Sequence, residues 1–168
     1  AYKKLKEQIG DAPHVTLLYV GEGDLRPMLE ERVQKENIPH VYFAGFKNQT
    51  EMARYYTISD IFIRTGGPYQ GDWGATVNES MVCGLPVIAA DALGAGDDLI
   101  YPGENGEVYP LGDTNALAKI LETLIRDPDL RHRMSKRSKE IIAKWGYKED
   151  IVGLKKALDA CARKSTGV

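Results

Sequence analysis

The sequence lacks the cysteine and histidine patterns that mark disulfide frameworks and metal sites. Its two cysteines, Cys83 and Cys161, are far apart and outside any CxxC pattern. Such residues indicate reduced, partly buried thiols rather than a disulfide or metal ligands. The three histidines, His14, His40 and His132, are scattered and give no metal-ligand spacing. The sequence therefore predicts no metal.

The sequence also lacks a dominant charge and a long apolar run. It has 22 basic and 24 acidic side chains, for a formal net charge of -2, so it has no basic footprint for nucleic acid. The longest apolar stretch, residues 85–96, is too short and interrupted to span a bilayer. The first ten residues form a charged, helix-like stretch rather than a secretory signal. We expect a cytoplasmic protein with no nucleic-acid partner and no transmembrane segment; peripheral membrane association stays open.

The chain does contain enough apolar sequence for one packed domain. Hydrophobic residues make up 43% of its 168 residues and charged residues 27%, which favours a sizeable core over disorder. Four apolar runs are typical of strands buried on both faces of a sheet, at residues 15–20, 41–46, 60–63 and 86–90. Helical patterns lie between them, at residues 25–37 with Asp24 as the expected N-cap, at 51–59, and at 75–84 ending at Gly84. This alternation predicts a three-layer α/β fold, in which helices cover both faces of a parallel sheet.

The last third of the chain is predicted to be mainly helical. After a short extended piece at 106–110, helical patterns cover residues 113–127, 128–145 and 148–162, with Asp113 as an N-cap and Pro128 at an early position. Residues 147–168 form the expected final helix and tail. That helix carries Ile151, Leu154 and Leu158 on one face, and we expect this stripe to be partly exposed.

Ligands of an open parallel sheet bind beyond the carboxyl ends of its strands, where we expect three loops. The first contains Gly21 and Gly23 and leads into a helix, so its N–H groups could face an anion. A plain turn explains these two glycines equally well. The third glycine of a dinucleotide fingerprint is missing, and no P-loop motif occurs in the chain. The second loop follows the strand at 41–46.

The third loop is more specific. Residues 64–74, RTGGPYQGDWG, are eleven residues with four glycines, whereas such loops usually have about 2–6 residues. The helix that follows has free first-turn N–H groups and a partial positive charge, so Gly74, Ala75 and Thr76 could hold a phosphate. Glu79 lies about one turn further along the same face. It could accept hydrogen bonds from sugar hydroxyls, although a plain surface glutamate is the commoner case.

Several segments resemble, in order and spacing, the C-terminal half of GT-B glycosyltransferases, most closely the retaining group 1 enzymes of family four. They are GEGDLRPMLE, VYFAGF, DWGATVNESMVCGLPVIAAD and DLIYPGENGEVYPLGDTNALA, and the resemblance covers roughly residues 15 to 145. It implies a single Rossmann-like domain that binds a UDP-, GDP- or ADP-linked sugar, with no cofactor. This would be the donor half of a retaining enzyme that transfers a hexose to a glycan, lipid or small-molecule acceptor.

The resemblance also implies roles for individual residues. Glu79 matches the second glutamate of a family motif in which seven residues separate two glutamates, and this second glutamate grips the ribose hydroxyls. The other implied contacts are the backbone at Gly74, Ala75 and Thr76 for the diphosphate, the loop at Phe46 and Lys47 for the nucleobase, and the glycine-rich turn of Gly21 and Gly23 near the cleft. No residue is predicted to be catalytic.

The sequence departs from the family's pattern in two places. Gly71 stands where the family has the first glutamate, which in many relatives faces the transferred sugar. The adjacent Asp72 could substitute for it, or be a solvated or helix-capping residue. Family members also begin this domain with a strand and a loop bearing an arginine and a lysine, and Ala1 enters after both. We therefore expect a piece of a two-domain enzyme that lacks its N-terminal acceptor domain and is inactive by itself.

A few further residues and functions stay open. Arg64 and Lys47 are each either a phosphate contact or a solvated surface charge, whereas Trp73 is interpreted as a packing residue rather than a sugar platform. Asp97 and Asp98 are interpreted as helix caps rather than an acid–base or metal pair. The alternative functions are half of a nucleotide-sugar epimerase, or a non-catalytic Rossmann-like domain for protein contacts.

Overall fold

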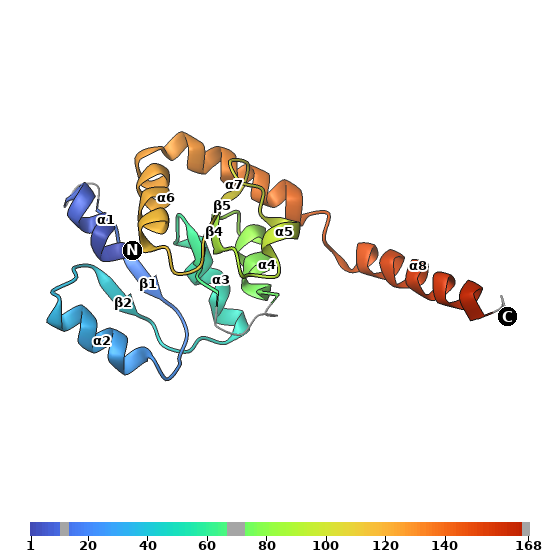
Figure 1. The fold of residues 1–168 in the computed structure, drawn as a ribbon, viewed down its shortest axis with the longest axis horizontal. Coiled ribbons are helices and arrows are strands. Elements are labelled where there is room, and N and C mark those ends of the chain that lie inside the picture. The colour runs from blue at the N-terminus through green and yellow to red at the C-terminus, as the bar shows by residue number, and fades with distance from the viewer. Residues whose placement is uncertain (11–13, 67–72, 166–168) are drawn as a thin grey trace.

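The computed structural model describes residues 1–10, 14–66 and 73–165, with side chains described up to residue 162. The described residues form eight helices and five strands (Figure 1): α1 (Tyr2–Ile9), β1 (Leu17–Tyr19), α2 (Arg26–Lys35), β2 (Val41–Phe43), α3 (Gln49–Thr57), β3 (Phe62–Arg64), α4 (Ala75–Val82), β4 (Val87–Ala90), α5 (Gly96–Leu99), β5 (Gly106–Tyr109), α6 (Thr114–Arg126), α7 (Pro128–Ile142) and α8 (Tyr147–Ser165). Each predicted helix and strand is therefore present.

Side-chain caps set the start of several helices. The Asp113 carboxylate accepts hydrogen bonds from the backbone of Asn115 and Ala116 at the start of α6, as predicted. The prediction that Asp24 caps α2 is wrong. Leu25 holds that position without a side-chain hydrogen bond. Ion pairs of Arg26 with Glu22 and Glu30 lie around this helix start instead.

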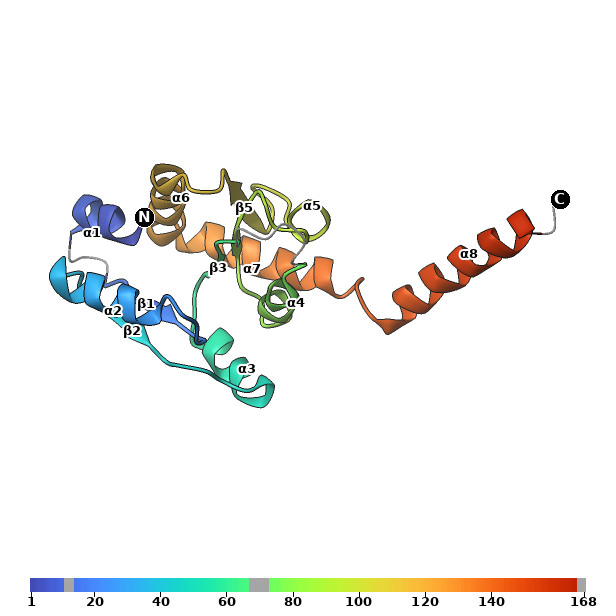
Figure 2. The ribbon, with the colours of Figure 1, turned by 60° about the horizontal axis from the view of Figure 1, so that its bottom comes forward.

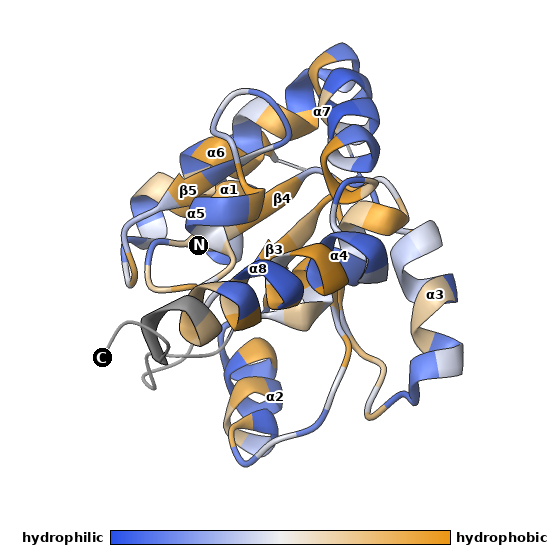
Figure 3. Ribbon diagram, turned by 90° about the vertical axis from the view of Figure 1, so that its right-hand side faces the viewer, coloured by the Kyte–Doolittle hydropathy of each residue, from blue (hydrophilic) through white to orange (hydrophobic). Residues whose placement is uncertain are grey.

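The strands β3, β4 and β5 form a parallel sheet covered by helices on both faces. β4 is wholly buried, and its side chains alternate between two clusters. Ile88 and Ala90 pack with residues of α1, α6 and α7, whereas Val87 and Ala89 pack with residues of α4, α5 and the end of α7. Figure 3 shows the strongly hydrophobic β3 and β4. The predicted three-layer, Rossmann-like α/β fold is confirmed.

The strands β1 and β2 form a separate two-stranded parallel sheet (Figure 2). The prediction that these two runs are buried on both faces is wrong, because their side chains are only half-buried or exposed. Among the described strands β1 is bonded only to β2, and β3 only to β4, so the two sheets do not join. Helix α2 buries none of its residues, and Leu25 and Met28 remain largely exposed.

Helix α8 extends away from the body of the molecule (Figure 1). Its stripe of Ile151, Leu154 and Leu158 is exposed at 64%, 62% and 61%, which agrees with the expected exposure. Cys161 on the same helix is exposed, contrary to the prediction of two partly buried thiols, whereas Cys83 is half-buried; both are free. No described helix combines the length and apolar character that crossing a bilayer requires.

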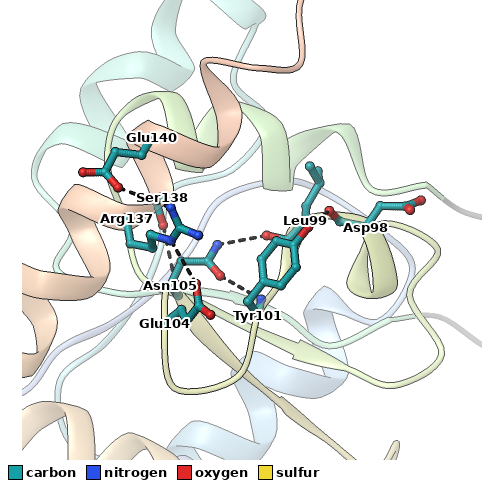
Figure 4. Close-up of polar contacts among 8 residues, drawn as sticks. All are labelled: Asp98, Leu99, Tyr101, Glu104, Asn105, Arg137, Ser138 and Glu140. Atoms are coloured by element: carbon teal, nitrogen blue, oxygen red, sulfur yellow. Dashed lines mark hydrogen bonds and ion pairs between the residues drawn. The ribbon is translucent and has the colours of Figure 1, made fainter. Parts of the chain in front are cut away.

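A buried asparagine connects α5, the following turn and α7 (Figure 4). The Asn105 amide donates to the Leu99 carbonyl at 2.9 Å and accepts from the Tyr101 N–H at 2.8 Å. Ser138 of α7 donates to the carbonyls of Leu85 and Asn105, at 2.8 and 3.4 Å. Residues 103–105 form a turn, and nothing in the local sequence indicates that the Asn105 side chain is fully buried.

We expect Asn105→Leu to destabilise the fold. The variant keeps a similar side-chain volume but leaves the Leu99 carbonyl and the Tyr101 N–H without their partner. Leaving buried polar groups unpaired costs roughly 1–3 kcal/mol each, so urea unfolding should show a clear loss of free energy. The matched control is Glu104→Gln, which removes only an exposed ion pair with Arg137. It should leave the urea midpoint nearly unchanged, and equal effects of the two variants would contradict this account.

Candidate functional site

The start of α4 lies beyond the carboxyl ends of β3 and β4 and is held by the loop after β4. Gly74 is the N-cap of α4, with φ of +81° in the left-handed region. A Cβ there would lie 2.9 Å from Leu93 Cδ1. The Trp73 carbonyl accepts a hydrogen bond of 3.0 Å from the Ala95 N–H. Both the backbone and the close approach of Leu93 therefore require a glycine at position 74.

The first turn of α4 has the features of an anion site. It contains no acidic residue, and the early N–H groups of a helix lack intrahelical acceptors and carry partial positive charge. The Thr76 Oγ1 atom is buried and finds no hydrogen-bond partner in the described part of the chain. Gly74, Ala75 and Thr76 thus lie together as a cradle for negative charge.

Glu79 lies one turn further along α4, half-buried, and its orientation is fixed from another helix. Its Oε2 atom accepts a hydrogen bond of 2.8 Å from the Tyr56 hydroxyl on α3. The Tyr56 side chain is 5% exposed, and its ring meets Phe62 of β3 edge-on at 5.8 Å. Burial, and then the Glu79 carboxylate, raise the pKa of Tyr56 well above its ordinary value. The phenol therefore keeps its proton and acts as the donor.

Tyr56 is the residue of this site that sequence reasoning missed. It stands at the end of a helical pattern, next to Tyr55, where an aromatic residue is typical of core packing. Its partner Glu79 is 23 residues away in sequence, so no local spacing could have connected the two.

The loop after β2 holds two of the predicted residues beside the start of α3. Phe46 is 72% exposed, and the Lys47 Nζ atom lies 5.7 Å from the centre of the Tyr55 ring. A capping box between Asn48 and Glu51 begins α3 directly after this loop. One helix therefore contacts Lys47 through Tyr55 and Glu79 through Tyr56.

Arg64 ends β3 and is half-buried. Its positive charge acts against the rise in the pKa of Tyr56, so it belongs electrostatically to the Tyr56–Glu79 pair. A role of Arg64 as a phosphate contact stays a prediction.

Gly21 and Gly23 lie in an exposed turn between β1 and α2. The Gly21 N–H donates to the Gly45 carbonyl at 2.9 Å, which ties this turn to the loop before Phe46. Within the described ranges no hydrogen bond or ion pair joins Gly21 or Gly23 to α4. This hydrogen bond thus brings the first two predicted loops together.

Trp73 packs against Trp145 at the junction between α7 and α8. The ring centres are 6.0 Å apart and the planes are tilted by 39°, while Trp73 Nε1 donates to Asn78 Oδ1 at 3.3 Å. These contacts agree with a packing role for Trp73. Gly71 and Asp72 lie outside the residues that the structure describes.

Asp97 and Asp98 are exposed in the first turn of α5, whose N-cap is Ala95 without a side-chain hydrogen bond. The interpretation of this pair as caps is therefore wrong. In the part of the chain that the structure describes, no cluster of His, Cys, Asp and Glu could hold a metal ion.

Comparisons with known proteins agree with this architecture. Residues 1–141 match the family described as glycosyl transferases group 1. The phosphatidyl-myo-inositol mannosyltransferase of Mycobacterium leprae is 30% identical over 138 residues, which cover 79% of this chain and 34% of that protein. The chain spans less than two fifths of the length of the first curated relatives that it matches.

Two solved structures show the same fold. Sucrose-phosphate synthase from Thermosynechococcus elongatus has a TM-score of 0.73 at 26% identity, with 95% of this chain and 43% of that chain covered. Anabaena HepE in complex with UDP-glucose has a TM-score of 0.73 at 24% identity, with 97% and 46% covered. Because the family match extends over most of the 168 residues, the chain belongs to the glycosyl transferases group 1 family.

Proposed function

We propose that this chain is the donor-binding domain of a glycosyltransferase and binds a nucleotide-diphosphate sugar at the first turn of α4. One observation carries the proposal. The cradle of Gly74, Ala75 and Thr76 lies one helical turn from a glutamate whose carboxylate is already oriented by Tyr56. The cradle suits a diphosphate, and the glutamate suits the hydroxyls of the adjoining ribose.

The cradle is suited to the diphosphate. The N-terminus of a helix carries roughly half a positive charge, with several N–H groups free to donate. Gly74 supplies the left-handed turn at which α4 begins, and the Thr76 hydroxyl, which has no partner among the residues that the structure describes, adds a donor. The same groups stabilise negative charge that develops on the leaving diphosphate, so the proposed transfer needs no metal.

Glu79 is suited to the ribose. A carboxylate only accepts hydrogen bonds, and the ribose 2′- and 3′-hydroxyls can donate them. Phe46 and Lys47 would lie along the nucleobase, with the Gly21–Gly23 turn beside them. Arg64 would add positive charge near the diphosphate, and Trp73 would hold the entry to α4 in place.

The finer aspects of the activity are also proposals. We propose a retaining transfer of a hexose from a UDP-, GDP- or ADP-linked donor. The solved structure of Anabaena HepE is a complex with UDP-glucose, which supports a nucleotide sugar as the donor. Gly71 stands where the family's pattern has a glutamate. Other groups, such as Asp72, would therefore contact the donor sugar.

The acceptor would bind to a second, N-terminal domain. The curated relatives are more than twice as long as the matched region, which supports a two-domain enzyme. Such a domain can cover surfaces of the two sheets, which do not join. It can also cover the exposed stripe of α8. In a two-domain enzyme, the chain alone would bind the donor without transferring the sugar.

We expect Glu79→Gln to weaken nucleotide binding. UDP, GDP and ADP, with their glucose conjugates, are titrated against the chain by calorimetry. Saturable binding of at least one is expected, and the variant should lose roughly 1.5–3 kcal/mol, or about ten- to a hundredfold in affinity. The matched control is Glu122→Gln on α6, a half-buried glutamate paired with Arg126, which should bind normally. Binding of no nucleotide, or equal binding by both variants, would contradict the proposal.

Gly74→Ala should separate backbone strain from ligand contact. The matched control is Gly103→Ala, because Gly103 has φ of +78° but open space where a Cβ would stand. The left-handed conformation costs an alanine roughly 1–2 kcal/mol, so both variants should melt a few degrees lower. Only Gly74→Ala, whose Cβ meets Leu93, should also lower nucleotide affinity by about tenfold or more. Normal nucleotide binding by Gly74→Ala would argue against the cradle.

Nucleotide binding should change the tryptophan fluorescence. Both tryptophans of the chain lie in the Trp73–Trp145 pair, and Trp73 directly precedes Gly74. Emission should therefore shift saturably as nucleotide is added. Trp145→Phe should keep a saturable signal with a changed spectrum, since Trp73 remains beside the site. An unchanged spectrum while calorimetry reports binding would show that the ligand lies elsewhere.

A further inference from the structure

We infer that Tyr56 is a positioning residue for the donor nucleotide, which orients the Glu79 carboxylate toward the ribose hydroxyls. The inference rests on the proposed function and adds to it a residue that no sequence motif marks. It stands on the placement of one buried phenol between two helices and a strand.

The surroundings of Tyr56 leave its hydroxyl one position. The side chain comes from the last turn of α3, is almost fully buried, and meets Phe62 of β3 edge-on. The ring is therefore held from two sides, and its hydroxyl reaches Glu79 Oε2 at 2.8 Å. A buried hydroxyl needs a partner, and within the described residues this carboxylate oxygen is the partner of the Tyr56 hydroxyl.

The hydrogen bond decides which part of the carboxylate a ligand can use. The proton of Tyr56 occupies one lone pair of Oε2, and Oε1 accepts no hydrogen bond in the described residues. A flexible glutamate would lose rotamer freedom on binding, whereas a carboxylate fixed beforehand does not. The ribose thus meets an acceptor that is already oriented.

The charges around the pair keep the direction of this hydrogen bond constant. Burial is the main cause of the raised pKa of Tyr56, the hydrogen bond and charge of Glu79 add to it, and the charge of Arg64 opposes it. The phenol therefore keeps its proton, and Tyr56 is the donor of this hydrogen bond.

The same helix links this pair to the proposed nucleobase loop. The capping box of Asn48 and Glu51 fixes the start of α3 after Lys47, and Tyr55 lies under the Lys47 ammonium group. Neighbouring tyrosines of one helix therefore contact the two parts of the site that would hold a nucleoside.

The test compares nucleotides with and without ribose hydroxyls. Tyr56→Phe keeps the ring and removes only the hydroxyl. Calorimetry is run with UDP, GDP and ADP and with their 2′,3′-dideoxy counterparts. Affinity for the hydroxyl-bearing nucleotide that the wild type binds best should fall roughly two- to tenfold, because a Glu79 side chain that is not fixed beforehand loses rotamer freedom on binding. Affinity for the matching dideoxynucleotide should stay unchanged, because that nucleotide lacks the ribose hydroxyls that would donate hydrogen bonds to Glu79.

Two further variants serve as controls. Tyr2→Phe removes a phenolic hydrogen bond of the same length, 2.8 Å to the Val15 carbonyl, away from the proposed site, and should bind both nucleotides normally. The double variant Tyr56→Phe/Glu79→Gln removes the phenol hydroxyl and the carboxylate charge together, so that no carboxylate is left without its donor if Tyr56→Phe alone is unstable. It should bind the hydroxyl-bearing nucleotide no more weakly than Glu79→Gln alone.

The outcomes separate this inference from the proposed function. Suppose that Glu79→Gln lowers the affinity for the hydroxyl-bearing nucleotide but not for its dideoxy counterpart, whereas Tyr56→Phe lowers both affinities equally or neither. The role of Tyr56 is then overturned and the proposed function stands. A double variant that binds clearly more weakly than Glu79→Gln also overturns it. If the wild type binds no nucleotide, or Glu79→Gln does not discriminate, the proposed function fails and the inference fails with it.

Discussion

The burial of β4 on both faces is the constraint on which the rest of the structure depends. Its alternate side chains enter two separate hydrophobic clusters, so the strand cannot shift without disrupting both layers of helices. The loop that leaves it carries Leu93 and Ala95 to Gly74 and Trp73. The first turn of α4 is thereby fixed at the edge of the sheet, where ligands of parallel α/β domains bind.

A polar arrangement is built on this frame in two steps. The start of α4 gathers N–H groups and a buried hydroxyl that has no partner among the described residues, and the next turn presents a carboxylate to a phenol of α3. Groups that favour an anion and a group that accepts from hydroxyls thus lie on one helix. This order is the physical reason for proposing a diphosphate-linked ribose as the ligand.

The sequence predicted what local chemistry decides. Alternating apolar runs and helical stripes located all five strands and the long helices, Asp113 marked the start of α6, and the residues around Gly74 and Glu79 indicated the candidate site. Contacts between distant segments could not be read in this way. The Tyr56–Glu79 bond and the burial of Asn105 depend on tertiary packing. An apolar run also does not reveal whether a neighbour covers it, so β1 and β2 were expected to be buried and are not.

The central claim is that a nucleotide diphosphate lies on the first turn of α4 with its ribose at Glu79. The most direct measurement is a crystal structure of the chain soaked with the nucleotide diphosphate that binds best. We predict phosphate oxygens within hydrogen-bond distance of the Ala75 and Thr76 N–H groups, and a ribose hydroxyl on Glu79 Oε1 with Tyr56 still bound to Oε2. A nucleotide bound elsewhere, or one whose ribose does not contact Glu79, would contradict the account.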